Sequence, residues 1–112
     1  MIEALWSVEF ITNVRGFGGG VVIFETGRIF GGDSSYFYTG TYQLEDMNGL
    51  LSATVKATHY SGNPLSAFGA YREFTLELSG KPTMPSFYAE GKMKEDPLLR
   101  IQVLLTYRAA LP

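Results

Sequence analysis

Strand-like runs, in which apolar and polar residues mostly alternate, fill nearly the whole chain. This period of two constrains the fold more than any other feature, because it places every second side chain on the same face of a sheet. Short turn sequences separate the runs, and no segment has a convincing helical period. The sequence therefore predicts about eight antiparallel strands, in these runs: Leu5–Val14, Gly20–Glu25, Arg28–Phe30, Tyr36–Leu44, Leu51–Thr58, Glu73–Leu78, Phe87–Lys94 and Leu98–Tyr107.

Sequential strands of this number favour an all-β fold in which they close into a small antiparallel up-and-down barrel. Closure removes the exposed sheet edges that would otherwise pair with other chains. The 13 glycines suit a curved sheet, and the 8 phenylalanines and 7 tyrosines can fill the space between its walls. A chain of 112 residues is the length of one domain, so we expect residues 1–112 to form a single barrel.

Charge and composition exclude several classes of partner. The net charge is −2 and no basic cluster occurs, so nucleic acid is not expected as a partner. The longest apolar run, Gly18–Phe24, is far shorter than the roughly 20 residues that span a bilayer, so no membrane partner is expected. The chain has no cysteine, and Glu3 stands where a signal peptide carries Lys or Arg. These features predict a cytoplasmic protein.

Glycines and prolines mark the turns and breaks. Asn48-Gly49 is the strongest hairpin signal in the chain. Gly31-Gly32 is expected to bend the chain, and Gly16–Gly20 to form a flexible hairpin or bulged turn. Gly40 interrupts a strand-prone run of tyrosines and threonines, which indicates a bulge, a bend or a close backbone approach. Ser61–Gly69 is the longest expected loop and has room for one helical turn.

The inward register of the strands defines a candidate ligand-binding interior. It mixes large aromatic side chains with very small ones such as Gly91. The small residues either leave a cavity for a small hydrophobic ligand or make room for the aromatic rings opposite them. The candidate lining residues are Trp6, Phe10, Ala53, Val55, Ala57, His59, Phe74, Phe87 and Ala89.

Catalytic chemistry has little support in the sequence. There is no cysteine, no nucleophile elbow around Ser34-Ser35, and one histidine, His59. His59 is open to three interpretations: a buried hydrogen-bonding group, a ligand contact or a base. One histidine without cysteines cannot build a usual zinc site, and no calcium loop occurs. We therefore expect no enzyme activity, no catalytic residues, no metal and no cofactor.

Three short motifs give the chain a resemblance to a known family. They are Gly31-Gly32-Asp33, Tyr38-Thr39-Gly40 and the acidic strand end Glu45-Asp46. The arrangement resembles the GrlR family, small repressors of type III secretion regulation. The resemblance extends through Ser7–Thr12, Gly18–Phe24 and the Thr26-Gly27 turn.

The resemblance implies a lipocalin-like barrel that dimerises and docks a transcriptional activator through a motif of four alternating Glu and Asp residues. In this chain the equivalent segment is Leu44-Glu45-Asp46-Met47, so the central acidic pair alone is kept. Glu45 and Asp46 are therefore candidate partner-binding residues for a protein with a basic surface; the alternative is a solvated turn.

Several strands are apolar on both faces, although a barrel buries only one face. A second copy of the chain would cover the other face and form a homodimer, unless the Ser61–Gly69 loop covers it. The strands concerned are Val21–Phe24, Tyr36–Tyr38 and the segments with Leu98-Leu99 and Leu104-Leu105.

Two functions are thus expected from the sequence. The first is a GrlR-like regulator, a repressor in transcription regulation that acts by protein–protein contact. The alternative is an intracellular carrier or sensor of a small hydrophobic ligand. The two also remain compatible with each other.

Overall fold

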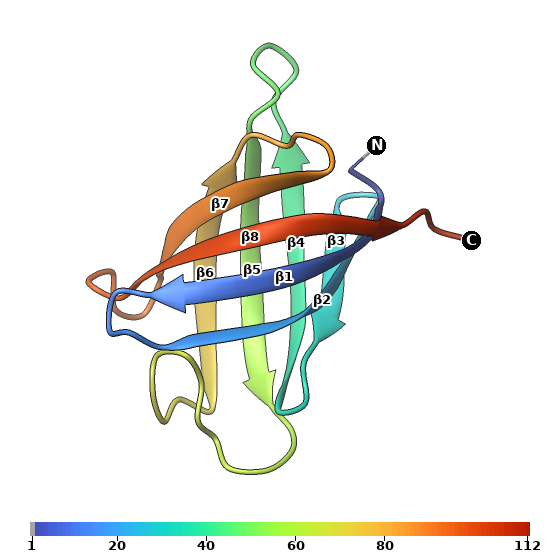
Figure 1. Cartoon of the computed structure of the whole chain (residues 1–112). Coiled ribbons are helices and arrows are strands. Elements are labelled where there is room, and N and C mark those ends of the chain that lie inside the picture. The colour runs from blue at the N-terminus through green and yellow to red at the C-terminus, as the bar shows by residue number, and fades with distance from the viewer. Residues whose placement is uncertain (1) are drawn as a thin grey trace.

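The eight expected strands are present and close into one antiparallel barrel. The computed structural model of the protein describes residues 2–112, and each strand pairs with the next along the chain while the last pairs with the first (Figure 1). The strands are β1 (Ala4–Thr12), β2 (Phe17–Glu25), β3 (Arg28–Gly32), β4 (Tyr36–Leu44), β5 (Leu51–His59), β6 (Glu73–Gly80), β7 (Ser86–Met93) and β8 (Arg100–Ala109). The all-β, up-and-down barrel predicted from the alternation is confirmed, and it is lipocalin-like, as the resemblance implies.

Residues 2–112 include no helix that would be long and apolar enough to pass through a membrane.

Three strands, β2, β3 and β6, are longer than the sequence predicts, because glycines that resemble turn residues belong to them; β6 continues to Gly80. β2 begins at Phe17, and Gly18 pairs with Phe10 of β1, whose ring occupies the space that a side chain on Gly18 would need. β3 continues through Gly31-Gly32 instead of bending there. The bend follows at Asp33, whose carboxylate accepts hydrogen bonds from the backbone N–H groups of Ser35 and Tyr36 at 2.8 and 2.7 Å.

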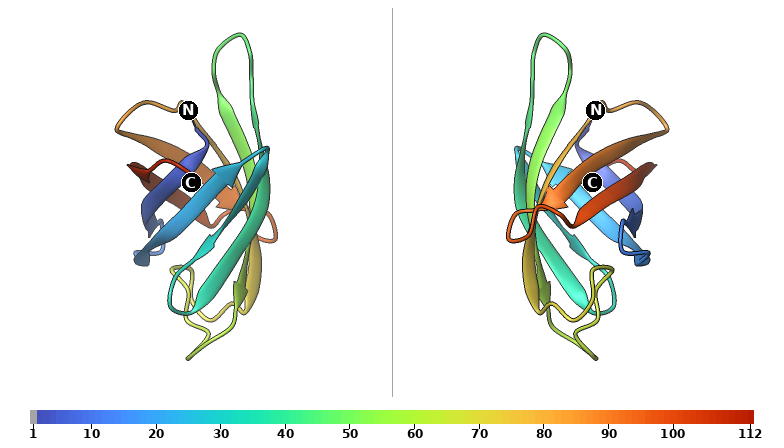
Figure 2. Two further views of the ribbon diagram at one scale, coloured as in Figure 1. Left: turned by 90° about the vertical axis from the view of Figure 1, so that its right-hand side faces the viewer. Right: turned by 90° about the vertical axis from the view of Figure 1, so that its left-hand side faces the viewer.

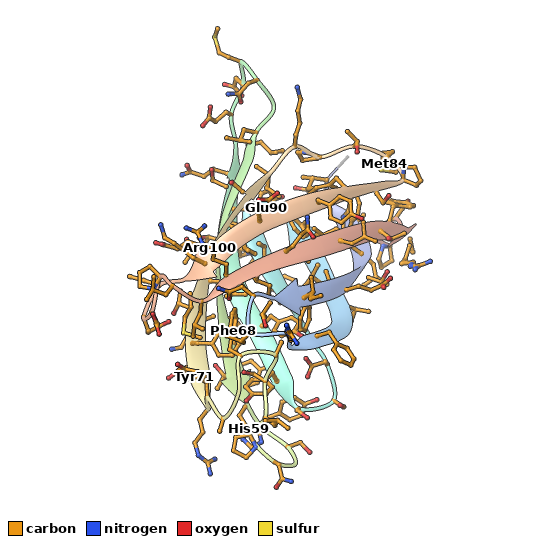
Figure 3. All side chains as sticks on the ribbon, turned by 60° about the vertical axis from the view of Figure 1, so that its left-hand side comes forward. His59, Phe68, Tyr71, Met84, Glu90 and Arg100 are labelled. Atoms are coloured by element: carbon orange, nitrogen blue, oxygen red, sulfur yellow. The ribbon has the colours of Figure 1, made fainter. Side chains whose placement is uncertain are left out.

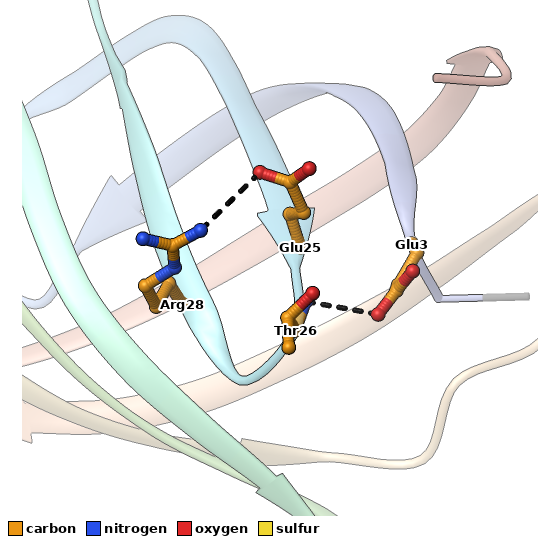
Figure 4. Close-up of polar contacts among 4 residues, drawn as sticks. All are labelled: Glu3, Glu25, Thr26 and Arg28. Atoms are coloured by element: carbon orange, nitrogen blue, oxygen red, sulfur yellow. Dashed lines mark hydrogen bonds and ion pairs between the residues drawn. The ribbon is translucent and has the colours of Figure 1, made fainter. Parts of the chain in front are cut away.

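The tight two-residue turn of the barrel is Thr26-Gly27, between β2 and β3 (Figure 4). Both residues have positive φ, 51° and 79°, as in the mirror-image turns that match strand twist. The Glu3 carboxylate accepts a hydrogen bond from the Thr26 N–H at 2.9 Å. The Arg28 guanidinium lies 3.6 Å from the Glu25 carboxylate and forms an ion pair with it. The hydrogen bond to Glu3 thus supports Thr26, a β-branched residue, in a left-handed backbone conformation that such residues rarely adopt.

The β4–β5 connection is wider than the two-residue turn predicted at Asn48-Gly49. Gly49 has a φ of 68°, whereas Asn48 is not among the residues with positive φ. The loop instead closes through the Glu45 N–H to the Leu50 carbonyl and the Gly49 N–H to the Glu45 carbonyl, both 2.9 Å. The Asn48 side chain accepts a hydrogen bond from the Leu50 N–H.

The barrel is flattened, since β1, β2, β7 and β8 cross over β4, β5 and β6 (Figures 1 and 2). The two ends of the β4–β5 hairpin lie far apart: its tip extends beyond the barrel at one end, and the segment after β5 folds across the opposite end. The long dimension of the molecule is 37 Å and the short one 20 Å. A barrel arranged in this way has two distinct ends at which function can reside.

Close backbone contacts between neighbouring strands explain Gly40 and Gly91. A β-carbon on Gly40 would lie 2.1 Å from the Thr54 carbonyl oxygen, and one on Gly91 would lie 1.8 Å from that of Glu77. Neither residue has positive φ, and the pairing of Gly40 with Ile29 and Val55 is regular. The prediction of a close approach at Gly40 is therefore confirmed, without a bulge. Gly91 is small for the same reason, and it does not line the interior cavity described below.

Candidate functional site

The barrel interior contains an apolar cavity of about 90 Å³. Its lining is wholly apolar and comes from all eight strands and from the segment between β5 and β6. Cavities of this character stay free of water, since a buried water needs polar partners. The small inward residues therefore do leave space, in addition to making room for aromatic rings.

Six of the nine residues proposed as cavity lining do line it. They share the inward register of β1, β5, β6 and β7, and they are Phe10, Ala53, Val55, Ala57, Phe74 and Ala89. The register followed directly from the alternation, because one face of each strand is buried.

Trp6 and Phe87 differ from the expectation because they are buried outside the cavity. Their rings meet edge to face at 5.3 Å, and Trp6 packs in the same way on Tyr107 at 5.8 Å. The Trp6 indole N–H donates to the Ile2 carbonyl at 2.9 Å. The rings of Trp6, Phe87 and Tyr107 close the barrel near the start of β1, so Trp6 and Phe87 pack there instead of lining the cavity.

His59 also lies outside the lining. It ends β5 opposite Tyr36, and its Nε2 is 2.7 Å from the Gly62 carbonyl oxygen. The ring stacks edge to face on Tyr36 at 5.5 Å. His59 therefore holds the start of the segment after β5 through a hydrogen bond, but the side chain is half-buried and is not the buried group of the first interpretation.

The segment Ser61–Arg72 crosses the end of the barrel and places Phe68 inside it (Figure 3). Phe68 is 7% exposed, lines the cavity and packs edge to face on Phe74 at 5.4 Å. The segment forms no helical turn; a Ser66–Gly69 bridge turns it tightly instead. It closes the barrel mouth, and Val21 and Phe37 on the outer face of the strands stay exposed.

Tyr38 connects the cavity wall to the Gly31-Gly32-Asp33 motif. Its ring lines the cavity, while its hydroxyl donates to the Asp33 carboxylate at 2.5 Å. Burial raises the pKa of the Tyr38 hydroxyl far above its usual value, and the neighbouring Asp33 carboxylate raises it further. The motif thus fixes the β3–β4 turn and anchors one wall tyrosine.

The tip of the β4–β5 hairpin forms the second candidate site. Glu45, Asp46 and Met47 are exposed there, and Met47 is 98% exposed. Within residues 2–112, the Glu45 and Asp46 carboxylates accept no hydrogen bond and form no ion pair. The two acidic side chains are therefore presented to solvent and are not used by the fold.

Part of the outer face is apolar, over β1, β2 and β3. Leu5, Ile23 and Phe30 lie in one cross-strand row, each paired with the next and each partly exposed. Val21 and Phe37 lie in the adjacent row on either side of Gly32, and both are exposed. These rows are the outward-facing residues of strands that are apolar on both faces.

No group of three or more His, Asp or Glu side chains within residues 2–112 is arranged to hold a metal ion. No known protein-family model matches the chain, and no curated protein matches it closely.

We expect Ala89→Leu to be tolerated, because Ala89 lines the cavity and the added carbons would extend into empty space. The free energy of unfolding should change by less than about 1 kcal/mol, whereas overpacking a filled core costs about 1–3 kcal/mol. Urea denaturation measures the difference. A loss of 2 kcal/mol or more would contradict a usable cavity at this position.

Proposed function

We propose that this chain is a regulatory protein similar to the GrlR family, a repressor that acts by binding another protein through the tip of its β4–β5 hairpin. The observation that carries the proposal is the projecting tip with Glu45, Asp46 and Met47, which the fold itself does not use (Figure 1). The resemblance in the Gly31-Gly32-Asp33 and Tyr38-Thr39-Gly40 motifs supports the same family.

The chemistry of the tip favours a partner with a basic surface and an apolar depression. Two carboxylates attract a positive patch over a distance of about a Debye length, roughly 8–10 Å at physiological salt. The exposed thioether of Met47 is flexible and polarisable, and such side chains adapt well to apolar surfaces. Charge would thus guide the encounter, and Met47 would supply apolar contact once the two proteins meet.

The test is the double variant Glu45→Ala with Asp46→Ala. It should keep its melting temperature, because these side chains have no partner in the fold. Association with the partner isolated from the source cells should slow by roughly tenfold at low salt, and the wild-type rate should fall as salt is added. Surface plasmon resonance on the purified partner measures both rates.

A matched control removes the same amount of negative charge from another part of the surface. Glu77→Ala with Glu90→Ala removes two exposed carboxylates from the outer faces of β6 and β7. This control should leave the association rate nearly unchanged. Equal slowing by both double variants would show that net charge, and not the hairpin tip, controls binding.

The proposal includes a homodimer that buries the apolar outer face of β1–β3. Burial of the Leu5, Ile23 and Phe30 row would not be screened by salt, so the dimer should persist at both low and high ionic strength. Ile23→Lys should yield monomers in sedimentation, and Thr41→Lys on the polar outer face of β4 should not. Monomeric wild-type protein at micromolar concentration in both salts would refute the dimer.

We place the proposed activity in the cytoplasm. The absence of cysteine from the sequence suits a reducing compartment, and a transcriptional repressor would act there. Fractionation of source cells tests this location, and recovery of the protein from another compartment would contradict it.

A second candidate function is the binding of a small hydrophobic ligand, as a carrier or sensor. The apolar cavity of about 90 Å³ favours it, because a lining without polar atoms suits a hydrocarbon group. The two functions use opposite ends of the β4–β5 hairpin and are compatible. Saturable binding of a hydrocarbon probe, as described next, tests this candidate.

A further inference from the structure

The segment Ser61–Arg72 is attached firmly at its two ends. The His59 N–H donates to the Arg72 carbonyl at 2.8 Å, which brings the start and the end of the segment together. The Tyr60 N–H donates to the Ser35 carbonyl at 2.9 Å. Between these anchors the segment crosses the barrel mouth as a loop.

Two side chains of the barrel wall also hold the segment, Thr12 near its middle and Tyr36 near its end. The Thr12 hydroxyl donates to the Ala67 carbonyl at 2.9 Å, and the Tyr36 hydroxyl donates to the Tyr71 carbonyl. Thr12 is buried, and its oxygen also accepts a hydrogen bond from the Gly16 N–H. Such attachments are far fewer than the continuous pairing of a strand, and segments of this kind open locally at low free-energy cost.

Phe68 fills the mouth beneath this loop. Its ring lies against Phe74 and forms part of the cavity wall, so any molecule entering from this end must displace it. Leu65 of the same loop is 72% exposed and faces away from the core. The loop thus combines a buried aromatic stopper with few fixed contacts.

We infer that Ser61–Arg72 is a lid, and that the cavity receives the alkyl chain of a ligand that enters by displacing Phe68. The inference rests on the second candidate function, ligand binding in the barrel. The cavity, about 90 Å³, is smaller than the roughly 150 Å³ that holds benzene in an engineered core. A longer hydrocarbon therefore fits only after the Phe68 ring vacates its position.

The wholly apolar lining also defines the ligand class. A charged or hydrogen-bonding group inside would lose its water without gaining a partner, which is costly. The ligand is therefore an alkyl chain whose polar end, where it has one, stays at the mouth beside Tyr36 and His59.

The experiment titrates n-octanol into the full-length protein and follows methyl resonances of Ala89 and Val55 by NMR. The wild-type protein should show saturable shifts at these methyl groups. Phe68→Ala should bind at least tenfold more tightly and exchange ligand faster, because the ligand no longer has to displace the ring. Tyr36→Phe, which removes one attachment of the lid without changing the cavity wall, should speed exchange.

Two controls make the result decisive. Leu65→Ala changes an exposed residue of the same loop and should leave affinity and exchange unchanged. Ala89→Leu fills the cavity and should abolish the shifts at Val55.

The outcomes separate the lid from the cavity. Saturable binding with equal affinity and exchange in the wild type, Phe68→Ala and Tyr36→Phe would overturn the lid while ligand binding stands. No saturable shift in the wild type or in either lid variant would overturn ligand binding itself, and the lid with it.

Discussion

Replacing Gly40 with valine should destabilise the barrel by about 3 kcal/mol or more, although valine favours strands more than glycine does. A β-carbon at this position would lie 2.1 Å from the Thr54 carbonyl oxygen and 3.0 Å from the Val55 Cα. Both atoms belong to the backbone of β5, so relief requires movement of a paired strand and not the rotation of a side chain. Urea denaturation of the wild type and the variant gives the difference in free energy of unfolding.

Thr39→Val is the matched control for Gly40→Val. Thr39 precedes Gly40 on β4 and faces outward, exposed to solvent. The same side chain introduced there meets no close backbone contact from within the barrel and should leave stability unchanged or slightly higher. A Gly40→Val variant as stable as Thr39→Val would show that β4 and β5 do not approach so closely.

The second large effect is expected at Trp6, which is 1% exposed. Trp6→Ala should cost about 3–5 kcal/mol, the usual range for truncating a buried large aromatic residue. The loss combines the contacts to Phe87 and Tyr107 with the hydrogen bond from the indole to the Ile2 carbonyl. Thermal or urea unfolding measures it.

A graded series at Trp6 tests how much of the lost stability comes from ring packing. Trp6→Phe keeps an aromatic ring on Phe87 but loses the indole N–H, so its stability should fall between the wild type and Trp6→Ala. Should Trp6→Ala cost less than about 1 kcal/mol, the aromatic group at this end of the barrel would not be a packed closure.

The sequence predicts the barrel well because one face of each strand is buried. In β5, the alternation of Leu51, Ala53, Val55 and Ala57 with polar residues identifies the inner face unambiguously, and a shift by one residue would expose all of them. The start of β2 was missed because Gly18–Gly20 resembles a loop in composition. Those glycines serve the packing between strands, which composition alone does not reveal.

The residues that line the cavity were only partly predictable from the sequence. Phe68 was missed, since it is one aromatic residue in a loop rich in glycine and polar residues, where no periodicity indicates which side chain turns inward. Leu65, in the same loop, is as apolar as Phe68 and yet exposed, so apolar character alone does not single out Phe68. Trp6 and His59 were assigned to the correct face of their strands, but position along the barrel axis decides which inward residues reach the cavity.

The hairpin tip illustrates the opposite case. Glu45 and Asp46 were recognised as an acidic pair at a strand end, and the structure adds that the tip projects from the barrel with Met47 beside them. Alternation identifies the inward and outward faces of β4 and β5, but not how far their hairpin extends beyond the neighbouring strands.

Site-specific photo-cross-linking tests the central proposal, docking through the hairpin tip, most directly. A photoactivatable benzophenone amino acid in place of Met47, 98% exposed, is compared with the same group in place of Leu98, an 81% exposed residue between β7 and β8. After irradiation in source cells, position 47 should cross-link one discrete protein and position 98 should not. The cross-link should weaken when Glu45 and Asp46 are replaced by alanine. Cross-linking to a discrete protein from position 98 but not from position 47 would contradict docking at the tip.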